Sequence, residues 1–504
     1  MEKDEVPTKR CLDTRLVLTI KKDGTRKARL TCRGFLQRKG IDFYDSSSPV
    51  KVYSTFKFLI AHALRNDRYL SMVDFAQAFL HPYLKEDIYI EAPELLGGLK
   101  GRPLKLEKTL YGLKQASHEW FNALRDCLVE LGFTQADRTD DECLFYSLEW
   151  DCYIVTHVDD CACSYGDQTK FNELIEKIKK KNFKFSQVET LKNILGLNIR
   201  RTAETITIHQ PGYIEQIIVD HRLDSLKPVG TPLVEWMKIR NDDEEEAFDN
   251  TKFRSLLGSL SHLARMSRPD IAQAVFHMAT FSCNPCERHW KGLTRIVQYL
   301  IGTIDYGITF IKNGNYSFYV DTDFAGCKNT RKSTTGYILK YCDGPIIEVS
   351  RRQRNVTLSS SEAEYCAFTD AVKDILWLKK IAKIFNEEFP EPAILFNDNL
   401  TAQGMAEGKC KPKRMRHIDA LSKFVEVKFN FIKEVINWGV VKLVHIKTSL
   451  NEADIMTKPL ARPVFTKHAN TLMNINSIIA GCVQNVVHNI DDVKPYDMNY
   501  MINE

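Results

Sequence analysis

Residues 154–163 read IVTHVDDCAC and place two adjacent acids, Asp159 and Asp160, inside a run that is mostly apolar, β-branched or sulfur-bearing. Both flanks have the composition of strands, so the stretch predicts a β-hairpin with the acids at its tip. Successive strand residues face opposite sides, so one acid would face a site and the other would support it. Two carboxylates at such a tip are costly unless a cation neutralises them, and hard oxygen ligands favour Mg²⁺ or Mn²⁺. For this stretch alone, a solvated turn remains the simpler interpretation.

A second acid stands in a matching context. The segment LSMVDFAQAFLHPYL (70–84) places Asp74 at the end of an apolar run, just before an amphipathic stretch. Together with the hairpin tip, this carboxylate could hold two Mg²⁺ ions about 3.5–4 Å apart, the arrangement that serves in-line phosphoryl transfer. The pair of motifs therefore favours a metal site over a solvated turn.

The chain as a whole has the composition of a multidomain globular protein. Its 504 residues are 44% hydrophobic and 27% charged, and the length predicts two to four domains. No stretch has the length and apolar character of a membrane span or a signal core, which predicts an intracellular protein. The cysteines are scattered and are expected to be reduced. The spacing of Cys283, Cys286 and His289 allows zinc, but a structural site needs four ligands, so we favour a helix terminus there.

Charge runs and periodicity divide the chain. Basic runs at 21–39, 177–184 and 409–416 favour a polyanionic partner over three unrelated solvated faces. The acidic run at 241–250 reads as a loop and predicts a boundary between a mixed α/β part and a helical part. From about residue 303 the apolar residues alternate with period two, and a long amphipathic pattern follows at 359–385. This order predicts an α/β domain with a mixed sheet.

The motifs, taken in order, carry a resemblance. KARLTCRGFLQRKGIDF, VDFAQAFLHPYL, LYGLKQASHEWF, HVDD and ILGLNI come first. They are followed by YVDTDFAGCKNTRKSTTGYI, SSSEAEY, LFNDN, RHID and NEADIMTKPL. Over roughly residues 10–465 the sequence resembles the reverse transcriptase–ribonuclease H part of a copia-type LTR retrotransposon Pol polyprotein, truncated at its N-terminus. One departure is ALSKFVE (420–426), which stands between RHID and VKFNFIKE where the family has almost no spacer.

The resemblance implies an α+β fold. A right-hand polymerase with fingers, palm and thumb would precede an α/β ribonuclease H-like domain with a mixed sheet. We expect the fingers, incomplete, and the palm at 1–200 and a helical thumb or connection at 201–302. The ribonuclease H-like domain would span 303–465, and a tail would span 466–504.

The resemblance also implies a polymerase site. Asp74, Asp159 and Asp160 would be its catalytic and metal-binding acids, with Asp160 in the supporting position. Four residues would contact the incoming nucleotide. Two meet its triphosphate, one borders the nascent base pair and one excludes a ribose 2′-hydroxyl: Lys27, Arg29, Gln115 and Phe79. An ordinary core position is the alternative for Phe79.

A second set of acids would form the nuclease site. By the same resemblance its catalytic and metal-binding members are Asp321, Glu362, Asp398 and Asp454. The neighbouring acids Asp323 and Glu364 are expected to be solvated or structural, and His445 is expected to be a packing residue.

The implied activity is RNA-directed DNA polymerisation with ribonuclease H cleavage, using two Mg²⁺ or Mn²⁺ ions per active site. The implied partners are an RNA template, a DNA primer or RNA–DNA hybrid, and deoxynucleoside triphosphates, with no membrane. The alternative is a decayed or domesticated fragment that binds nucleic acid without turnover. A DNA-binding structural protein of unrelated fold would require the whole series of acids to be accidental.

Overall fold

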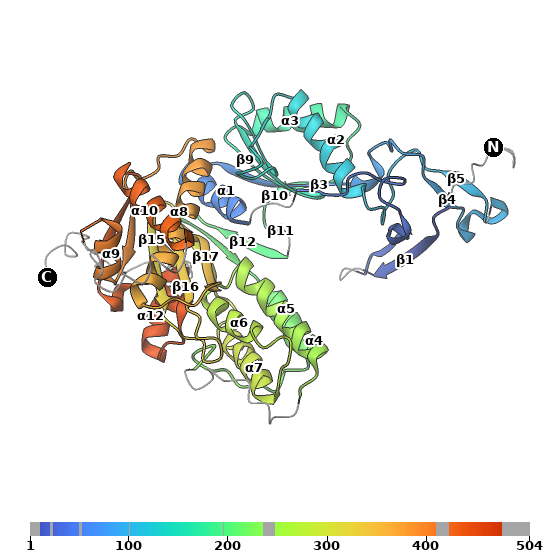
Figure 1. The fold of residues 1–504 in the computed structure, drawn as a ribbon. Coiled ribbons are helices and arrows are strands. Elements are labelled where there is room, and N and C mark those ends of the chain that lie inside the picture. Colours follow the sequence, from blue (N-terminus) through green and yellow to red (C-terminus); the bar gives the residue numbers. More distant parts are fainter. Residues whose placement is uncertain are drawn as a thin grey trace, which may run out of the picture.

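The structure is a computed structural model that describes residues 11–20, 24–49, 53–99, 101–194, 196–234, 247–409 and 423–475. Residues 241–246 of the expected acidic loop and 420–422 of the expected insertion lie outside these ranges, as do residues 410–416 of the third basic run. Among the described helices, none is both long and apolar enough to cross a membrane. The N-terminal strands lie at one end of an elongated molecule and the last helices lie at the other (Figure 1).

A six-stranded antiparallel sheet dominates the first half of the chain, in the order β10-β3-β9-β8-β7-β6. Along β9, Cys161 and Cys163 face one core while Ala162 faces the other. This period-two alternation of apolar residues buries both faces of the sheet. Helices α2 and α3 cover one face and α1 covers the other (Figure 1). The elements are β3 (Tyr69–Phe75), β6 (Thr134–Gln135), β7 (Leu144–Ser147), β8 (Cys152–His157), β9 (Asp160–Tyr165), β10 (Phe185–Thr190), α1 (Tyr53–Arg65), α2 (Ala116–Glu130) and α3 (Gln168–Lys180).

The N-terminal end consists of two small hairpins, β1 (Thr14–Ile20) with β2 (Arg26–Cys32) and β4 (Tyr89–Glu91) with β5 (Pro103–Lys105). Backbone contact joins the first hairpin to the segment before α2. A Cβ on Gly112, whose φ is +90°, would lie 2.1 Å from the Cys32 carbonyl oxygen, and one on Gly34 would lie 1.9 Å from the Gly112 oxygen. Only glycine permits this approach, so the hairpin is fixed through two side-chain-free positions.

A four-stranded sheet connects the halves of the chain, in the order β11-β12-β13-β14. Its last strand, β14 (Gly307–Ile311), pairs antiparallel with β13 (Thr205–His209). The expected boundary at 303 is therefore wrong, because β14 completes the connecting sheet instead of opening the next domain. The remaining elements of this region are β11 (Asn193–Ile194), β12 (Leu197–Arg201), α4 (Pro211–Asp220), α5 (Asn250–Met266), α6 (Ala272–Ala279) and α7 (Glu287–Ile301).

The C-terminal part is a five-stranded mixed sheet in the order β17-β16-β15-β18-β19. The pairs β15–β16 and β16–β17 are antiparallel, whereas β15–β18 and β18–β19 are parallel, as the sequence pattern predicted. Its elements are β15 (Ser317–Asp323), β16 (Thr334–Tyr341), β17 (Gly344–Arg352), α8 (Ser360–Ile384), β18 (Ala393–Asn397), α9 (Leu400–Ala406), α10 (Lys423–Asn437), β19 (Val441–His445), α11 (Asp454–Thr457) and α12 (Arg462–Met473).

The last helix corrects the expected start of the tail at residue 466. Helix α12 continues to Met473, and its Leu472 and Met473 are buried with the core of α5, α6 and α7. The amphipathic pattern of this helix could not be assigned to a domain from sequence because its apolar partners on α5, α6 and α7 lie more than 150 positions away.

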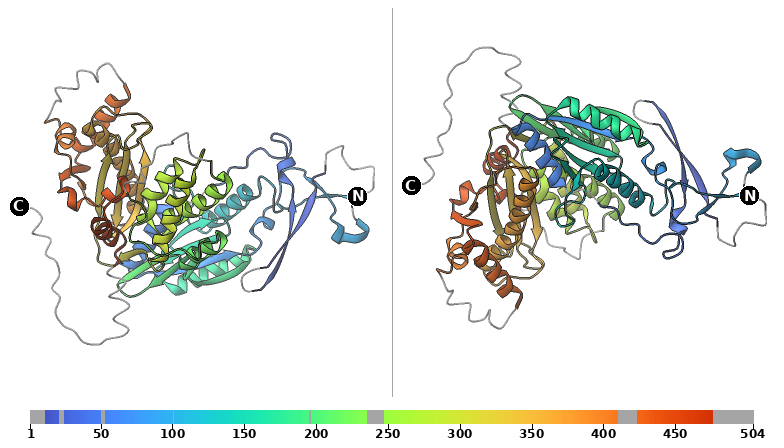
Figure 2. Two further views of the ribbon diagram at one scale, coloured as in Figure 1. Left: turned by 90° about the horizontal axis from the view of Figure 1, so that it is seen from below. Right: turned by 90° about the horizontal axis from the view of Figure 1, so that it is seen from above.

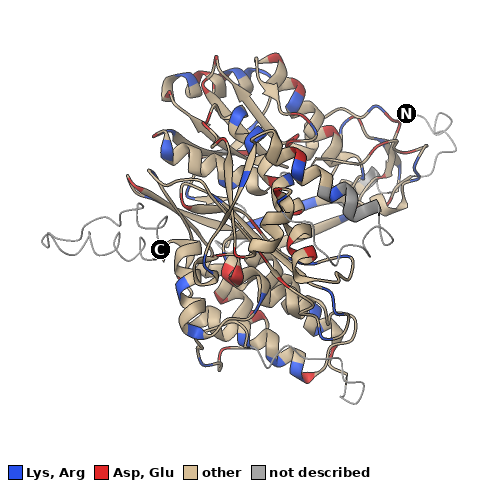
Figure 3. Cartoon of the chain, turned by 60° about the vertical axis from the view of Figure 1, so that its left-hand side comes forward, with Lys and Arg blue, Asp and Glu red and all other residues tan. Residues whose placement is uncertain are grey.

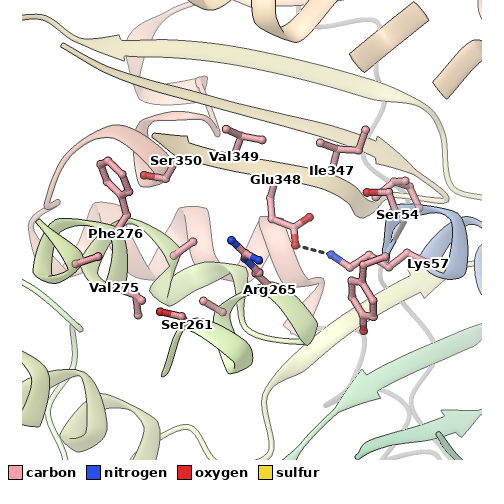
Figure 4. Close-up of a pocket in the computed structure, with 15 residues that line it drawn as sticks. Ser54, Lys57, Ser261, Arg265, Val275, Phe276, Ile347, Glu348, Val349 and Ser350 are labelled. Atoms are coloured by element: carbon pink, nitrogen blue, oxygen red, sulfur yellow. Dashed lines mark hydrogen bonds and ion pairs between the residues drawn. The ribbon is translucent and has the colours of Figure 1, made fainter. Parts of the chain in front are cut away.

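One continuous core joins the first sheet to the last. Apolar residues of α1, β13, β14, β16 and α8 belong to a single buried cluster. Lys57 of α1 and Glu348 of β17 form an ion pair beneath it, with their side chains 1% and 7% exposed. Figure 4 shows the pair lining a cavity of about 490 Å³ that α5 and α6 also border. The two views of Figure 2 show the C-terminal part seated against the rest of the chain.

Candidate active sites

The first pair of acids lies where two neighbouring strands meet. Asp74 stands on β3 and pairs in register with Asp160, the first residue of β9. Opposed residues of an antiparallel pair project to the same face, so Asp74 and Asp160 share one side of the sheet. Asp159 lies in the turn between β8 and β9, and its carbonyl oxygen accepts a hydrogen bond from the Phe75 N–H at 2.9 Å. The predicted hairpin tip is confirmed.

The turn that holds Asp159 is strained. Val158 has a φ of +57° and is 42% exposed, and a β-branched residue rarely adopts this left-handed conformation. Its carbonyl oxygen accepts a hydrogen bond from the Trp120 indole nitrogen at 2.6 Å, which ties the turn to α2. The surrounding structure therefore over-determines the position of the two adjacent acids.

Ser186 is a second partner of Asp74. The β10–β3 register shifts between Phe185 and Gln187, which makes Ser186 the bulged residue. Its hydroxyl group donates to the Asp74 carboxylate and lies 3.1 Å from the Asp74 carbonyl oxygen. A bulge commonly redirects one side chain, and here it directs the Ser186 hydroxyl onto the acid.

Of the four residues expected to contact the nucleotide, Lys27, Arg29 and Phe79 are partly exposed and Gln115 is buried. Lys27 and Arg29 alternate along β2 and so share a face. The Arg29 guanidinium lies 5.8 Å from the centre of the Tyr111 ring, and Phe79 packs edge-on against the same ring at 5.4 Å. Tyr111 therefore joins the β2 hairpin to the segment that follows Asp74.

Gln115 is not available at the surface. It is 1% exposed, accepts a hydrogen bond from the Gln37 amide at 2.9 Å and donates to the Asp42 carbonyl oxygen at 3.0 Å. The structure thus places the Gln115 side chain in the interior and not at the exposed position that its expected contact with a nascent base pair would need.

The second group of acids converges at the C-terminal sheet. One carboxylate oxygen from each of Asp321, Glu364 and Asp398 lies within 4.8 Å of the other two. Asp321 is on the central strand β15, Asp398 follows β18, and Glu364 is in the second turn of α8. Parallel pairing of β15 with β18 brings the two aspartates to one edge of the sheet.

Glu362 is elsewhere, so its assignment to this site is wrong. Its carboxylate accepts a hydrogen bond from the Leu358 N–H at 2.7 Å, while the Ser359 hydroxyl accepts from the Glu362 N–H at 3.1 Å. Glu362 thus caps the start of α8, as a glutamate three positions after an N-cap serine commonly does. Glu364, expected to be solvated or structural, takes the site position instead.

Asp454 adjoins this cluster through Lys458. The Lys458 ammonium lies 3.0 Å from an Asp454 carboxylate oxygen and 3.5 Å from one of Asp321. The Thr457 hydroxyl also donates to Asp321. Helix α11 therefore supplies an acid and a hydroxyl to one edge of the cluster, and the residue that caps its C-terminus supplies a cation.

Burial and mutual repulsion govern the protonation of these acids. Burial, together with Asp321 and Asp398, raises the pKa of Glu364 well above its usual range. Burial and then Asp321 raise the pKa of Asp454 to about 7, against the opposing effect of Lys458. Burial disfavours the charged Lys458, but Asp321 and Asp454 outweigh it and raise its pKa. Such shifts arise where carboxylates crowd together in a poorly solvated place.

The residues fit a divalent cation at this site. The buried Glu364 Oε2 has no hydrogen-bond partner among the described residues, and a set of carboxylate oxygens is the ligand type that Mg²⁺ and Mn²⁺ prefer. Within the described chain, Asp74, Asp159 and Asp160 do not form a comparably close group. The carboxylates of the first site are therefore less closely grouped than those of the second.

Three remaining expectations concern single residues. Cys286 is the N-cap of α7 and its Sγ lies 3.1 Å from Nδ1 of His289, which confirms the helix terminus expected there. The Asp323 carboxylate lies against the backbone of Gly326. His445 is exposed at the end of β19, so its assignment as a packing residue is wrong. The cysteines in the described ranges are free thiols.

The site residues that sequence reasoning missed had weak signals. Ser186 follows no motif, and its contact with Asp74 depends on a bulge. Lys458 lies four positions after Asp454, a spacing that places both side chains on one helix face. That spacing was the one local signal that could have found it.

Comparisons with known proteins agree with this picture. Residues 4–235 match the reverse transcriptase (RNA-dependent DNA polymerase) family. Residues 4–235 thus correspond to a reverse transcriptase domain, and most of the chain is similar to retrovirus-related Pol polyproteins. The chain is 31% identical over 455 residues, 88% of its length, to the retrovirus-related Pol polyprotein from transposon RE1 of Arabidopsis thaliana. It is also 31% identical over 486 residues, 91% of the chain, to that from transposon TNT 1-94 of Nicotiana tabacum.

The chain spans 30% and 35% of the length of these two relatives. Among solved structures, a match covers 28% of the chain and 91% of LC11-RNase H1, a protein crystallised in complex with an RNA/DNA hybrid. The sequence identity is 17% and the TM-score is 0.21.

Proposed function

We propose that the chain is an RNA-directed DNA polymerase with ribonuclease H activity, derived from a copia-type retrotransposon, with fingers, palm and thumb in its first three hundred residues. The observation that carries the proposal is the presence of two acid sites on two separate sheets. Asp74, Asp159 and Asp160 lie at a strained hairpin inside the reverse transcriptase-family domain. Asp321, Glu364 and Asp398 form a buried cluster on the mixed sheet that follows.

In each site the acids would hold two divalent ions, which activate the attacking oxygen and stabilise the leaving oxygen of a phosphoryl transfer. In the nuclease, Asp321, Glu364 and Asp398 would hold one ion and Asp321 with Asp454 would hold the other, since Asp321 adjoins both groups. Thr457 and Lys458 hold the Asp321 carboxylate in place. In the polymerase, Ser186 does the same for Asp74.

The nucleotide pocket lies between β2 and the segment after Asp74. Lys27 and Arg29 face the triphosphate, because guanidinium and ammonium groups make charge-assisted hydrogen bonds to phosphate oxygens. Phe79 faces the sugar and excludes a 2′-hydroxyl. The shared contact of Arg29 and Phe79 with Tyr111 supports this arrangement, since it brings a phosphate-binding and a sugar-facing residue to one ring.

Two assays on the full chain test the proposal. Primer extension on poly(rA)·oligo(dT) with Mg²⁺ or Mn²⁺ measures the polymerase, and cleavage of a labelled RNA–DNA hybrid measures the nuclease. Asp159→Asn should abolish extension and leave cleavage, whereas Asp398→Asn should do the reverse. A chain that binds the hybrid and performs neither reaction would instead be the nucleic-acid-binding remnant without turnover.

A further inference from the structure

A cleft bordered by two arginines lies at the start of α12, a few residues after the nuclease acid Asp454. The loop at 228–234, helix α7 with the segment that follows it, and the stretch at 459–470 enclose two adjoining hollows of about 620 and 480 Å³. Gly230 and Arg462 line both hollows, and Arg295 lines the smaller one. No aspartate or glutamate is among the described residues that line either hollow. Among the described residues, the cleft therefore presents positive charge without an acidic neighbour in its lining.

Among the described residues, Arg295 makes one side-chain hydrogen bond and keeps a nitrogen donor without a partner. Its Nη2 donates to the Thr231 hydroxyl at 3.0 Å, while its buried Nε has no hydrogen-bond partner among the described residues. Burial lowers the pKa of Arg295. A buried guanidinium donor without a partner is costly, and an anion bound at the accessible part of the Arg295 guanidinium would offset that cost by stabilising its charge.

Arg462 lies across the backbone of Gly230. A Cβ at position 230 would lie 2.5 Å from the Arg462 Nε and 3.0 Å from its Cζ. The glycine therefore leaves the space that the guanidinium occupies at the junction of the two hollows. No described acid pairs with either arginine. Figure 3 shows positions of Lys and Arg interspersed with positions of Asp and Glu along much of the chain, whereas the described residues that line this cleft include no acid.

The cleft is close to the nuclease acids along the chain. Pro459, Leu460 and Arg462 line it, and the Lys458 ammonium contacts Asp321 and Asp454. Four residues span at most about 14 Å. A nucleic-acid strand at the acids therefore has neighbouring phosphates within reach of Arg462.

We propose that Arg295 and Arg462 form a phosphate-binding site that holds the backbone of the nucleic-acid duplex beside the nuclease acids. The inference rests on the proposed function and adds a second anchoring point to it. Guanidinium groups bind phosphate oxygens with paired N–H donors, and the site would read no base because it faces the backbone. Free phosphate or pyrophosphate offers the same chemistry and is separated from the duplex by the experiment.

The test is fluorescence anisotropy of a labelled RNA–DNA hybrid with the full chain at several salt concentrations, with Ca²⁺ replacing Mg²⁺. Arg462→Gln should weaken binding severalfold and reduce the slope of log K against log salt by about one, the effect of one lost phosphate contact. Arg138→Gln removes the same charge from a side chain that is 90% exposed on the first sheet domain and should bind as the parent does. Thermal melting of each variant checks the fold. Arg462→Lys keeps the positive charge that Arg462→Gln removes, and it therefore separates the effect of charge from that of the guanidinium group.

A set of hybrids, each with one neutral methylphosphonate, adds positional information. The parent protein should lose affinity when the modification lies at the contacted phosphate, and Arg462→Gln should be insensitive at that position alone. Equal affinity, slope and position dependence in parent and variant would overturn the site while leaving cleavage intact. Protection from melting by pyrophosphate that needs Arg462, without any change in hybrid binding, would assign the cleft to a free anion and also overturn the duplex assignment. A parent that binds no hybrid would reject the proposed function itself.

Discussion

At the residue scale, the rotation of helix α8 determines that Glu364, and not the expected Glu362, lies in the acid cluster. The two glutamates are separated by about 200° around an α-helix, so only one of them can face the sheet. Glu362 lies in the first turn, where its carboxylate satisfies a free N–H group. Glu364 is buried against Asp321 and Asp398. The SSSEAEY motif contains both residues, and the capping geometry separates their roles.

The first prediction compares these two neighbours. Glu364→Gln should abolish hybrid cleavage, because an amide cannot replace an anionic oxygen at the centre of the cluster. Glu362→Gln should retain cleavage and lower stability by at most about 1 kcal/mol, the usual value of a helix cap. Cleavage rates and thermal melting measure both effects. Loss of cleavage in Glu362→Gln with a normal melting curve would return that residue to the site.

The second prediction concerns Phe79, which packs on Tyr111 and borders two apolar clusters. As a steric gate, Phe79→Val should raise ribonucleotide incorporation relative to deoxyribonucleotide incorporation, since a rigid wall against one group discriminates strongly. As a core residue, it would lower stability and leave the ratio unchanged. Steady-state incorporation of each nucleotide by the purified variant gives that ratio, and an unchanged value would remove the gate.

At the element scale, glycines fix the N-terminal hairpin onto the first sheet domain. Gly112 has a positive φ and its α-carbon faces the Cys32 carbonyl oxygen. The adjacent Tyr111 carbonyl accepts a hydrogen bond from the Cys32 N–H at 2.7 Å. The strand that carries Lys27 and Arg29 is thus positioned by backbone contact, which no side-chain pattern reveals.

The third prediction uses a matched pair of glycines. Gly112→Ala should destabilise the protein by more than the roughly 1–2 kcal/mol of a left-handed alanine, because its Cβ would also strike backbone. Gly132→Ala has nearly the same φ, +85°, but its Cβ would meet only the Glu149 side chain at 3.4 Å. It should show the conformational cost alone. Denaturant unfolding of both variants measures the difference, and equal losses would show that the hairpin contact adds nothing.

At the scale of the whole molecule, the buried pair of Lys57 and Glu348 links α1 of the first sheet domain to β17 of the last (Figure 4). Burial raises the pKa of Glu348 and Lys57 lowers it. The second Glu348 oxygen has no described partner. Removing one member of such a pair leaves an uncompensated buried charge.

The fourth prediction follows from that pair. Lys57→Met should cost about 3–5 kcal/mol of stability near neutral pH, whereas Lys57→Met with Glu348→Leu should recover most of it. The loss should shrink toward acid. Without Lys57 the folded pKa of Glu348 rises further above its unfolded value near 4.5. Below that value both states are protonated, and above it only the unfolded state ionises freely. Denaturant unfolding at pH 5 and pH 8 tests the sign, and a loss that is larger at pH 5 would contradict it.

The sequence by itself determined the local features of this protein. The hairpin around Asp159, the strand that carries Asp74, the alternating strands after residue 303 and the long helix at 359–385 follow from periodicity and turn chemistry, which act over neighbouring residues. The order of the motifs also indicated the family, because a long series of specific sequence motifs does not arise by chance.

Only the tertiary structure decided which of these features meet. The pairing of β14 with β13, the burial of Gln115, the contact of Ser186 with Asp74 and the inward position of Glu364 each depend on residues that are distant in the chain or on the rotation of a helix. Local patterns specify which face of an element is apolar. They do not specify which distant element will cover that face, because the choice depends on the packing of the whole core.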